Sequence, residues 1–305
     1  MGRTTSDERA PGASSPRASN DYFALSMRPL YCFWFLGVLV ALFEAGTLLY
    51  LTDQREGIQH TVRARRLLDL FFQNFGVAGF MATGLAMLTV LLVWHVLTKP
   101  RQPWTVRPAV LAGMALEASL WALPLVVFGT IFQRTAFAAL SREATCAAES
   151  FLLGGGGWWA GGAALLPALA SDAGTRLLDM SWQARVTIAI GAGIYEEMLF
   201  RLVGMAAVHF VARDLLQARE LTARAIAVGV TAVAFAAYHD VGAMGGGAGG
   251  VGGVMPRAEQ LAALGFYCAA GVYFGVIYLT RGFGIVVAAH AVYDVLALVV
   301  LAPRS

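Results

Sequence analysis

The sequence predicts an all-α, polytopic membrane protein of about eight transmembrane helices around an intramembrane polar cavity. Of its 305 residues, 58% are hydrophobic and only 13% are charged, and the mean hydropathy is +0.65. Soluble domains carry about 25% charged residues, so an ordinary soluble enzyme is excluded. The apolar residues also gather in stretches of about 20, the length that crosses a hydrocarbon core about 30 Å thick. We therefore expect a multi-pass integral membrane protein embedded in a lipid bilayer.

The chain divides into three regions. Residues 1–28 are polar, with no apolar period and no signal-peptide core, and are expected to form a disordered tail. Residues 29–180 are expected to form N-terminal transmembrane helices without a recognised motif, and residues 181–302 carry the motifs described below. The apolar segments are 31–52, 68–98, 107–132, 148–170, 185–212, 222–240, 259–280 and 283–301.

Glycine makes two parts of this pattern ambiguous. Segment 148–170 contains Gly154 to Gly157 and Pro167, which is consistent with a close-packed helix, a broken helix or a re-entrant loop. Glycines also crowd into residues 242–253, which we expect to be a linker between two helices.

The charge balance excludes one class of partner and leaves the orientation open. The chain has 22 Lys and Arg against 19 Asp and Glu, so it lacks the basic footprint of a nucleic-acid-binding protein. Lys and Arg are nearly equal on the two sides of the predicted bundle, so the positive-inside rule gives no orientation. Abundant Ala, Gly and Arg indicate a GC-rich bacterial source, and hence the bacterial cytoplasmic membrane.

Charged residues inside apolar segment 185–212 are the first candidates for function. An ionised side chain at the bilayer centre costs at least a few kcal/mol unless it is paired or hydrated. Glu197 and Arg201 are spaced i, i+4 and can pair on one helix face. Glu196 lies about 100° around the helix, without that partner, and can serve as a general base. Taken alone, the trio fits a buried ion pair that fixes helix packing equally well.

Two later segments add further ionisable groups. Segment 222–240 ends near His239, and segment 283–301 holds His290 and Asp294 at i, i+4 spacing. Each group would be a separate cost of burial if it lay alone. We therefore expect these residues to converge with the trio on one polar cavity.

Such a cavity could hydrolyse an amide in two ways. In the first, Glu196 polarises a water, and His239 with the His290/Asp294 pair orients it or stabilises the oxyanion. In the second, His239, His290 and Asp294 bind a divalent metal such as zinc, and Glu196 or Glu197 acts as base on the metal-bound water. No cofactor is certain. Both schemes use the same residues.

Two more carboxylates lie within apolar segments. Glu44 is in segment 31–52 and Glu117 is in segment 107–132. They either extend the polar cavity, or they pair with another helix or lie near a helix end.

The three motifs, in their order along the chain, resemble those of a known family. Glu196-Glu197-x-x-x-Arg201, Phe235-x-x-x-His239 and His290-x-x-x-Asp294 are similar to the motifs of the CPBP (Abi) family of intramembrane proteases. That family includes the CAAX prenyl endopeptidases and bacterial relatives linked to bacteriocin processing and self-immunity. The similar region runs from about 185 to 300.

The resemblance implies an eight-helix bundle with its site in a conical membrane cavity. It implies that Glu196 activates the attacking water, that Glu197 and Arg201 support it, and that His239 positions or deprotonates the water. His290 and residue 294 would stabilise the oxyanion.

Many members of the family carry Asn at the position of Asp294. An ionised Asp would repel an oxyanion, so Asp294 would be protonated, orient His290 or bind a metal.

The expected function is therefore that of an intramembrane endopeptidase acting on a membrane-associated protein or peptide, with a Glu-activated water. The substrate class includes prenylated chains and chains with a C-terminal signal. The alternative is a non-catalytic membrane protein, either an immunity scaffold or an ion- or proton-coupled carrier.

Overall fold

The computed structural model describes residues 21–52, 64–65, 68, 82–98, 104–145, 179–244 and 257–301. Every regular element in this part of the chain is a helix, which confirms the predicted all-α class. The elements are α1 (Tyr22–Ser26), α2 (Pro29–Gly46), η1 (Thr47–Leu51), α4 (Ala82–Thr98), α5 (Pro108–Thr145), α7 (Trp182–Glu197), η5 (Met198–Gly204), α8 (Met205–Phe210), η6 (Val211–Leu215), α9 (Glu220–Met244), α10 (Arg257–Arg281), α11 (Phe283–Val295) and η7 (Leu296–Val300).

Several of these helices are long and apolar enough to cross a membrane. The described residues contain five such spans: Pro29–Leu51, Pro108–Phe132, Glu220–His239, Leu261–Arg281 and Phe283–Val300. Each coincides with a segment predicted from the sequence, and together they identify an integral membrane protein.

The predicted count of about eight spans is not confirmed. Of segment 68–98, the structure gives a shorter apolar helix at Gly84–Leu97. Segment 148–170 lies outside the described residues. Most of the predicted linker at residues 242–253 also lies outside them, since α9 ends at Met244 and the next described residue is Arg257.

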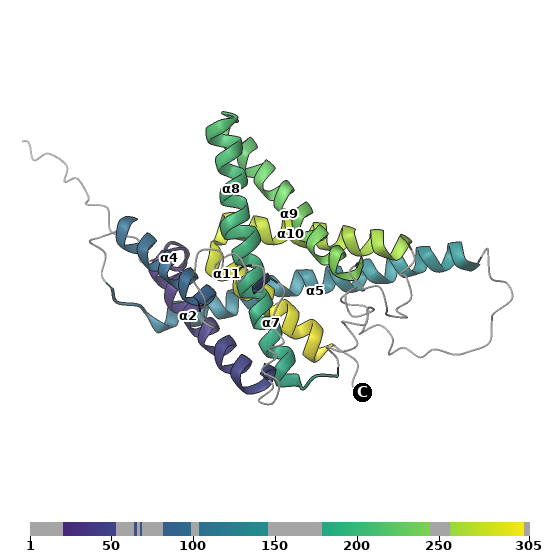
Figure 1. Ribbon diagram of the computed structural model, residues 1–305, viewed down its shortest axis with the longest axis horizontal. Helices are drawn as coiled ribbons and strands as arrows, with labels where there is room; N and C mark the ends of the chain where they lie inside the picture. The colour runs from purple at the N-terminus through teal and green to yellow at the C-terminus, as the bar shows by residue number, and fades with distance from the viewer. Residues whose placement is uncertain are drawn as a thin grey trace, which may run out of the picture.

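The rod that contains predicted segment 185–212 runs through the middle of the molecule. It comprises α7, η5, α8 and η6, which follow one another without a break and appear as a single rod in Figure 1. The Ser181 hydroxyl caps the start of α7 by accepting a hydrogen bond from the Ala184 backbone N–H at 3.3 Å. The rod bears the charged trio at the junction of α7 and η5, where the helix widens from α to π geometry. Such π turns are frequent at functional sites.

The other helices pack around this rod. Helix α7 lies against α2 on one side and α11 on another, α11 also packs on α5, and α9 pairs with α10. Glycine allows the closest approach: a Cβ at Gly193 would lie 2.7 Å from the Val287 carbonyl oxygen. Small residues at crossings of this kind let membrane helices pack backbone to backbone. The contact fixes α11 closely against the part of α7 that precedes the trio.

One stretch of the predicted disordered tail is helical. Tyr22–Ser26 form the short helix α1, and Leu25 and Ser26 are buried, so the prediction of disorder is wrong for this stretch. The reason is a set of tertiary contacts: the Tyr22 hydroxyl donates to Glu117 at 2.6 Å, and Arg281 donates to the Ser26 hydroxyl at 3.1 Å. Residues 1–20 lie outside the described part.

Glu44 and Glu117 both pair with other parts of the chain. Glu117 on α5 is held by Arg281 of α10, with Nη2 to Oε2 at 2.8 Å. Glu44 on α2 accepts a hydrogen bond from the Tyr195 hydroxyl at 3.1 Å and lies 3.5 Å from Nη2 of Arg65. Of the two expectations for these carboxylates, pairing is therefore the one the structure supports.

Candidate active site

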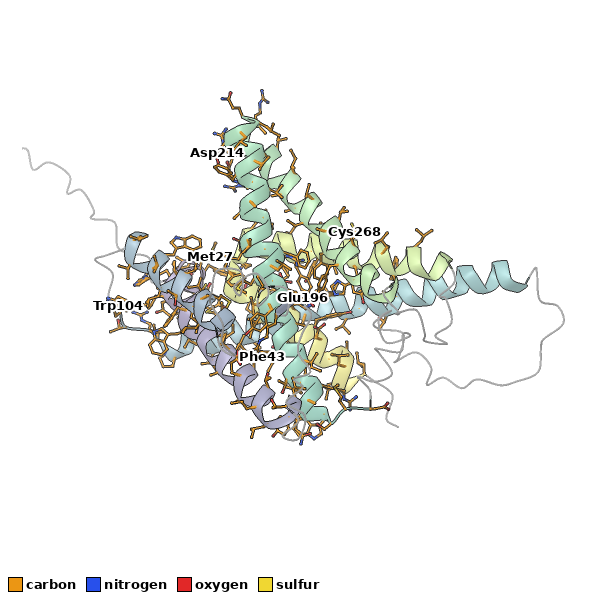
Figure 2. The ribbon with its side chains drawn as sticks, viewed as in Figure 1. Met27, Phe43, Trp104, Glu196, Asp214 and Cys268 are labelled. Carbon is orange, nitrogen blue, oxygen red and sulfur yellow. The ribbon has the colours of Figure 1, made fainter. Side chains whose placement is uncertain are left out.

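Five of the predicted site residues lie deep inside the bundle. Figure 2 labels Glu196 at the centre of the molecule, where the rod meets its neighbouring helices. Glu197 and Arg201 have no exposed surface, and Glu196, His290 and Asp294 are less than a tenth exposed. Burial of this degree requires that the charged groups find partners within the protein.

Glu196 faces two imidazoles that come from different helices. Its Oε2 lies 3.5 Å from Nε2 of His239 on α9 and 3.9 Å from Nε2 of His290 on α11. The convergence predicted for three separate segments is therefore present. These separations exceed a direct N–H···O hydrogen bond of about 2.9 Å, so the carboxylate and the rings are neighbours rather than tightly bonded partners.

Glu197 has a different set of partners. Its Oε1 lies 3.0 Å from Nη1 of Arg201, as the i, i+4 spacing predicts. The same oxygen lies 2.7 Å from Nδ1 of His290, a contact that the sequence does not indicate. Because an ionised carboxylate only accepts hydrogen bonds, Nδ1 is the donor. Glu197 therefore holds the His290 ring with Nε2 directed toward Glu196.

Arg201 is enclosed by backbone and aromatic groups. Its Nη2 donates to the Gly271 carbonyl oxygen of α10 at 3.2 Å. Its guanidinium carbon lies 4.6 Å from the ring centre of Phe235 and 5.4 Å from that of Phe274, within cation–π range. These contacts stabilise a fully buried cation beside Glu197.

Aromatic rings also flank the imidazoles. Tyr267 stacks on His239 with ring centres 4.1 Å apart and planes at 18°. Phe274 stacks on His290 at 4.7 Å and 19°. Both aromatic residues are on α10, and sequence reasoning missed them because the helix is apolar on either side of them and no spacing separates these rings from ordinary packing. They restrict the orientation of the two histidines.

Asp294 lies on the Nε2 side of His290. Its Oδ2 is 3.5 Å from that nitrogen. The Nδ1 atom of His290 is bonded to Glu197, so Glu197 rather than Asp294 orients the ring through this atom. Asp294 thus borders the same small region as Glu196 and the two imidazole Nε2 atoms.

The backbone sets the tautomer of His239. Its Nδ1 lies 2.8 Å from the Phe235 carbonyl oxygen, one turn earlier on α9. A carbonyl oxygen can only accept, so Nδ1 carries the hydrogen and, in the neutral ring, Nε2 presents a lone pair. Two acceptors, His239 Nε2 and Glu196 Oε2, then face each other, an arrangement that favours a proton donor bound to both.

The geometry does not support the predicted metal ligands. Within the described part of the chain, no group of three or more His, Cys, Asp and Glu side chains could hold a metal ion. The proposed set of His239, His290 and Asp294 therefore does not fit a metal centre in this arrangement. No step below involves a metal.

The fold and the site together define a helical membrane protein with a buried carboxylate–histidine site. Residues 179–296 match a family model described as type II CAAX prenyl endopeptidase Rce1-like. This match confirms the resemblance to the CAAX-protease-like family, which implies a membrane peptidase. The matched region contains all six predicted site residues. No curated protein and no solved structure matches the chain.

Proposed function

We propose that this protein is an intramembrane endopeptidase that uses Glu196 to activate water. The observation that carries the proposal is the position of Glu196, whose carboxylate faces Nε2 of both His239 and His290. The family match supports the choice of a peptide bond as the target. We place the catalytic core at residues 181–302 and the protein in the bacterial cytoplasmic membrane.

The nucleophile in this proposal is a water held by two acceptors. A water that donates its hydrogens to Glu196 Oε2 and His239 Nε2 keeps its lone pairs free for attack. The tautomer of His239 supports this arrangement, because its Nδ1 hydrogen is engaged by the Phe235 carbonyl. The polar cavity expected from the sequence would be the space around this water.

Hydrolysis then needs one proton transfer in each direction. Glu196 takes a proton from the water as the oxygen attacks the carbonyl carbon of the scissile amide, forming a tetrahedral oxyanion. Nε2 of His290, when protonated, donates to that oxyanion, and Glu197 on Nδ1 stabilises the imidazolium. Glu196 returns its proton to the leaving nitrogen as the C–N bond breaks, which yields a carboxylic acid and an amine. Asp294 lies beside the same nitrogen, with Oδ2 3.5 Å from Nε2.

The proposed substrate is a peptide that reaches the site from the bilayer. The family model describes CAAX prenyl endopeptidases, which points to substrates with a prenylated C-terminal CAAX sequence. A farnesylated CAAX peptide in detergent micelles is therefore the first probe, and the same peptide without the prenyl group is its control.

The decisive variant is Glu196→Gln, which keeps the size of the side chain and removes the base. General-base catalysis contributes about 10²- to 10⁴-fold to the rate. We therefore expect Glu196→Gln to lower the rate of cleavage by about 10³-fold and to leave the melting temperature unchanged. Glu220→Gln is the matched control, because Glu220 lies in an exposed ion-pair cluster with Arg224 and His209. Wild-type turnover in Glu196→Gln would overturn the assignment, and ion flux through liposomes in its place would indicate a carrier.

A further inference from the structure

A second polar cluster lies on another face of the helix that carries the candidate base. Tyr195 immediately precedes Glu196 on α7, and its hydroxyl donates to Oε1 of Glu44 on α2 at 3.1 Å. Nη2 of Arg65, from the short described stretch 64–65, lies 3.5 Å from Oε2 of Glu44. All three side chains of this cluster are buried, and Tyr195 has no exposed surface. The family model begins at residue 179, so Glu44 and Arg65 come from the unmatched N-terminal region.

We propose that Tyr195, Glu44 and Arg65 form a brace that fixes the rotation of α7 about its axis and thereby positions Glu196 for the activation of water. The inference rests on the function proposed above. The three residues are positioning residues, because they act on the reaction only through the placement of Glu196.

The contacts of Tyr195 are suited to this role. Its ring packs edge-on against Phe43 with ring centres 5.2 Å apart, and the guanidinium carbon of Arg65 lies 5.7 Å from the Tyr195 ring centre and 5.2 Å from that of Phe43. A hydrogen bond, an edge-to-face ring contact and a cation–π contact thus hold the Tyr195 side chain. Adjacent residues on a helix point about 100° apart, so a rotation that displaces Tyr195 displaces Glu196 by the same angle.

Helix α4 closes the brace from a further side. A Cβ at Gly84 would lie 3.3 Å from the Tyr195 hydroxyl, 3.6 Å from Oε1 of Glu44 and 3.1 Å from a methyl group of Val40. The backbone of α4 therefore approaches the hydroxyl as closely as a glycine permits. Any added side-chain atom would press on the hydrogen bond between Tyr195 and Glu44.

A small rotation is enough to matter. A helix with its side chains has a radius of roughly 5 to 6 Å, so a turn of about 10° moves a side-chain end by roughly 1 Å. A misplacement of about 1 Å at a reacting group can lower the rate by about 10²-fold. A brace that prevents such a rotation would therefore affect turnover far more than substrate binding.

The chain supplies a matched control for the chemistry of the brace. Tyr22, Glu117 and Arg281 also form a Tyr–Glu–Arg cluster, in which the Tyr22 hydroxyl donates to the carboxylate at 2.6 Å. This cluster joins α1, α5 and α10 and is not adjacent to Glu196 in the chain. Removal of either tyrosine hydroxyl takes away the same kind of hydrogen bond, but only one of the two is next to the candidate base.

The test compares Tyr195→Phe with Tyr22→Phe in the full-length protein. Cleavage of a farnesylated CAAX peptide in micelles gives kcat and KM, and thermal unfolding gives Tm. We expect Tyr195→Phe to lower kcat by roughly 10- to 100-fold with KM within about twofold of wild type. Tyr22→Phe should leave kcat unchanged, even if its Tm falls by as much as the Tm of Tyr195→Phe.

Further variants separate positioning from simple loss of stability. Glu44→Gln keeps an oxygen that can accept from Tyr195 and should retain more of kcat than Glu44→Ala. Gly84→Ala removes no polar group and should still lower kcat, because its methyl group crowds the Tyr195 hydroxyl. These variants carry the test if Tyr195→Phe does not fold.

The outcomes distinguish this inference from the proposed function. Equal kcat in Tyr195→Phe and Tyr22→Phe, together with loss of cleavage in Glu196→Gln, would overturn the brace and leave the peptidase assignment intact. Wild-type cleavage in Glu196→Gln would overturn both. A fall in kcat confined to the Tyr195, Glu44 and Gly84 variants would support the brace.

Discussion

The ion pair between Glu197 and Arg201 allows a prediction that separates stability from catalysis. Both side chains have no exposed surface, and Glu197 Oε1 contacts Nη1 of Arg201 at 3.0 Å and Nδ1 of His290 at 2.7 Å. The perturbation is a double-mutant cycle with Glu197→Met, Arg201→Met and the two changes combined. Methionine has a similar length, carries no charge and fills irregular spaces.

The magnitude follows from what each variant leaves behind. Removal of one partner strands the other charge in the interior, and such changes cost about 3–5 kcal/mol. If the two changes acted independently, the double variant would lose about twice as much, roughly 6–10 kcal/mol. Because the second change removes the charge that the first left unpaired, we expect the double variant to lose no more than either single variant. The coupling energy should therefore be about 3 kcal/mol or more.

The assay has two arms. Equilibrium unfolding in mixed micelles, followed by tryptophan fluorescence, gives the free energies of the four proteins. Cleavage of the farnesylated peptide gives their activities. The double variant should regain stability but not activity, because the His290 ring has lost the acceptor that directs its Nε2 toward Glu196. Additive losses of stability would refute the buried pair, and an active double variant would refute the orientation of His290 by Glu197.

Three further predictions concern the packing and the metal. Gly193→Ala should lower the stability by about 1–3 kcal/mol, since the new methyl group would lie 2.7 Å from the Val287 carbonyl oxygen, whereas the control Gly229→Ala meets nothing within 4 Å and should keep or raise Tm. Gly282→Ala should cost about 1–3 kcal/mol in thermal unfolding because Gly282 precedes α11 with φ at 84° and ψ at 176°, a conformation that is essentially confined to glycine, and an unchanged Tm would contradict this. Treatment with 1,10-phenanthroline should leave cleavage unchanged, whereas loss of cleavage that zinc restores would support the metal-assisted scheme.

Local spacing was sufficient to predict the parts of the site that lie on one helix. The pair of Glu197 and Arg201 follows from the i, i+4 rule, because both residues lie on one continuous helical stretch. The five apolar spans also coincide with predicted segments, since hydropathy over about 20 residues depends only on composition. Burial costs further predicted that Glu196, His239 and His290 would meet.

Contacts between helices were beyond sequence reasoning. The hydrogen bond of His290 to Glu197, the stack of Tyr267 on His239 and the bond of Tyr195 to Glu44 all depend on the rotation of one helix against another. Nothing in the hydrophobic period of one helix fixes its rotation against a neighbouring helix. The helix α1 was missed for a related reason, because its polar surroundings in the sequence conceal partners more than ninety residues away.

The partners of four glutamates explain why Glu196 is better suited than Glu44, Glu117 and Glu197 to accept and return a proton. Glu44, Glu117 and Glu197 each pair with an arginine, a cation that does not give up its proton in proteins. Glu196 instead faces two imidazoles, groups that can both accept and donate a proton. The neighbouring histidines can therefore share a proton taken up by Glu196. The carboxylates that pair with arginine therefore hold helices together, whereas the histidine partners of Glu196 make it the candidate base.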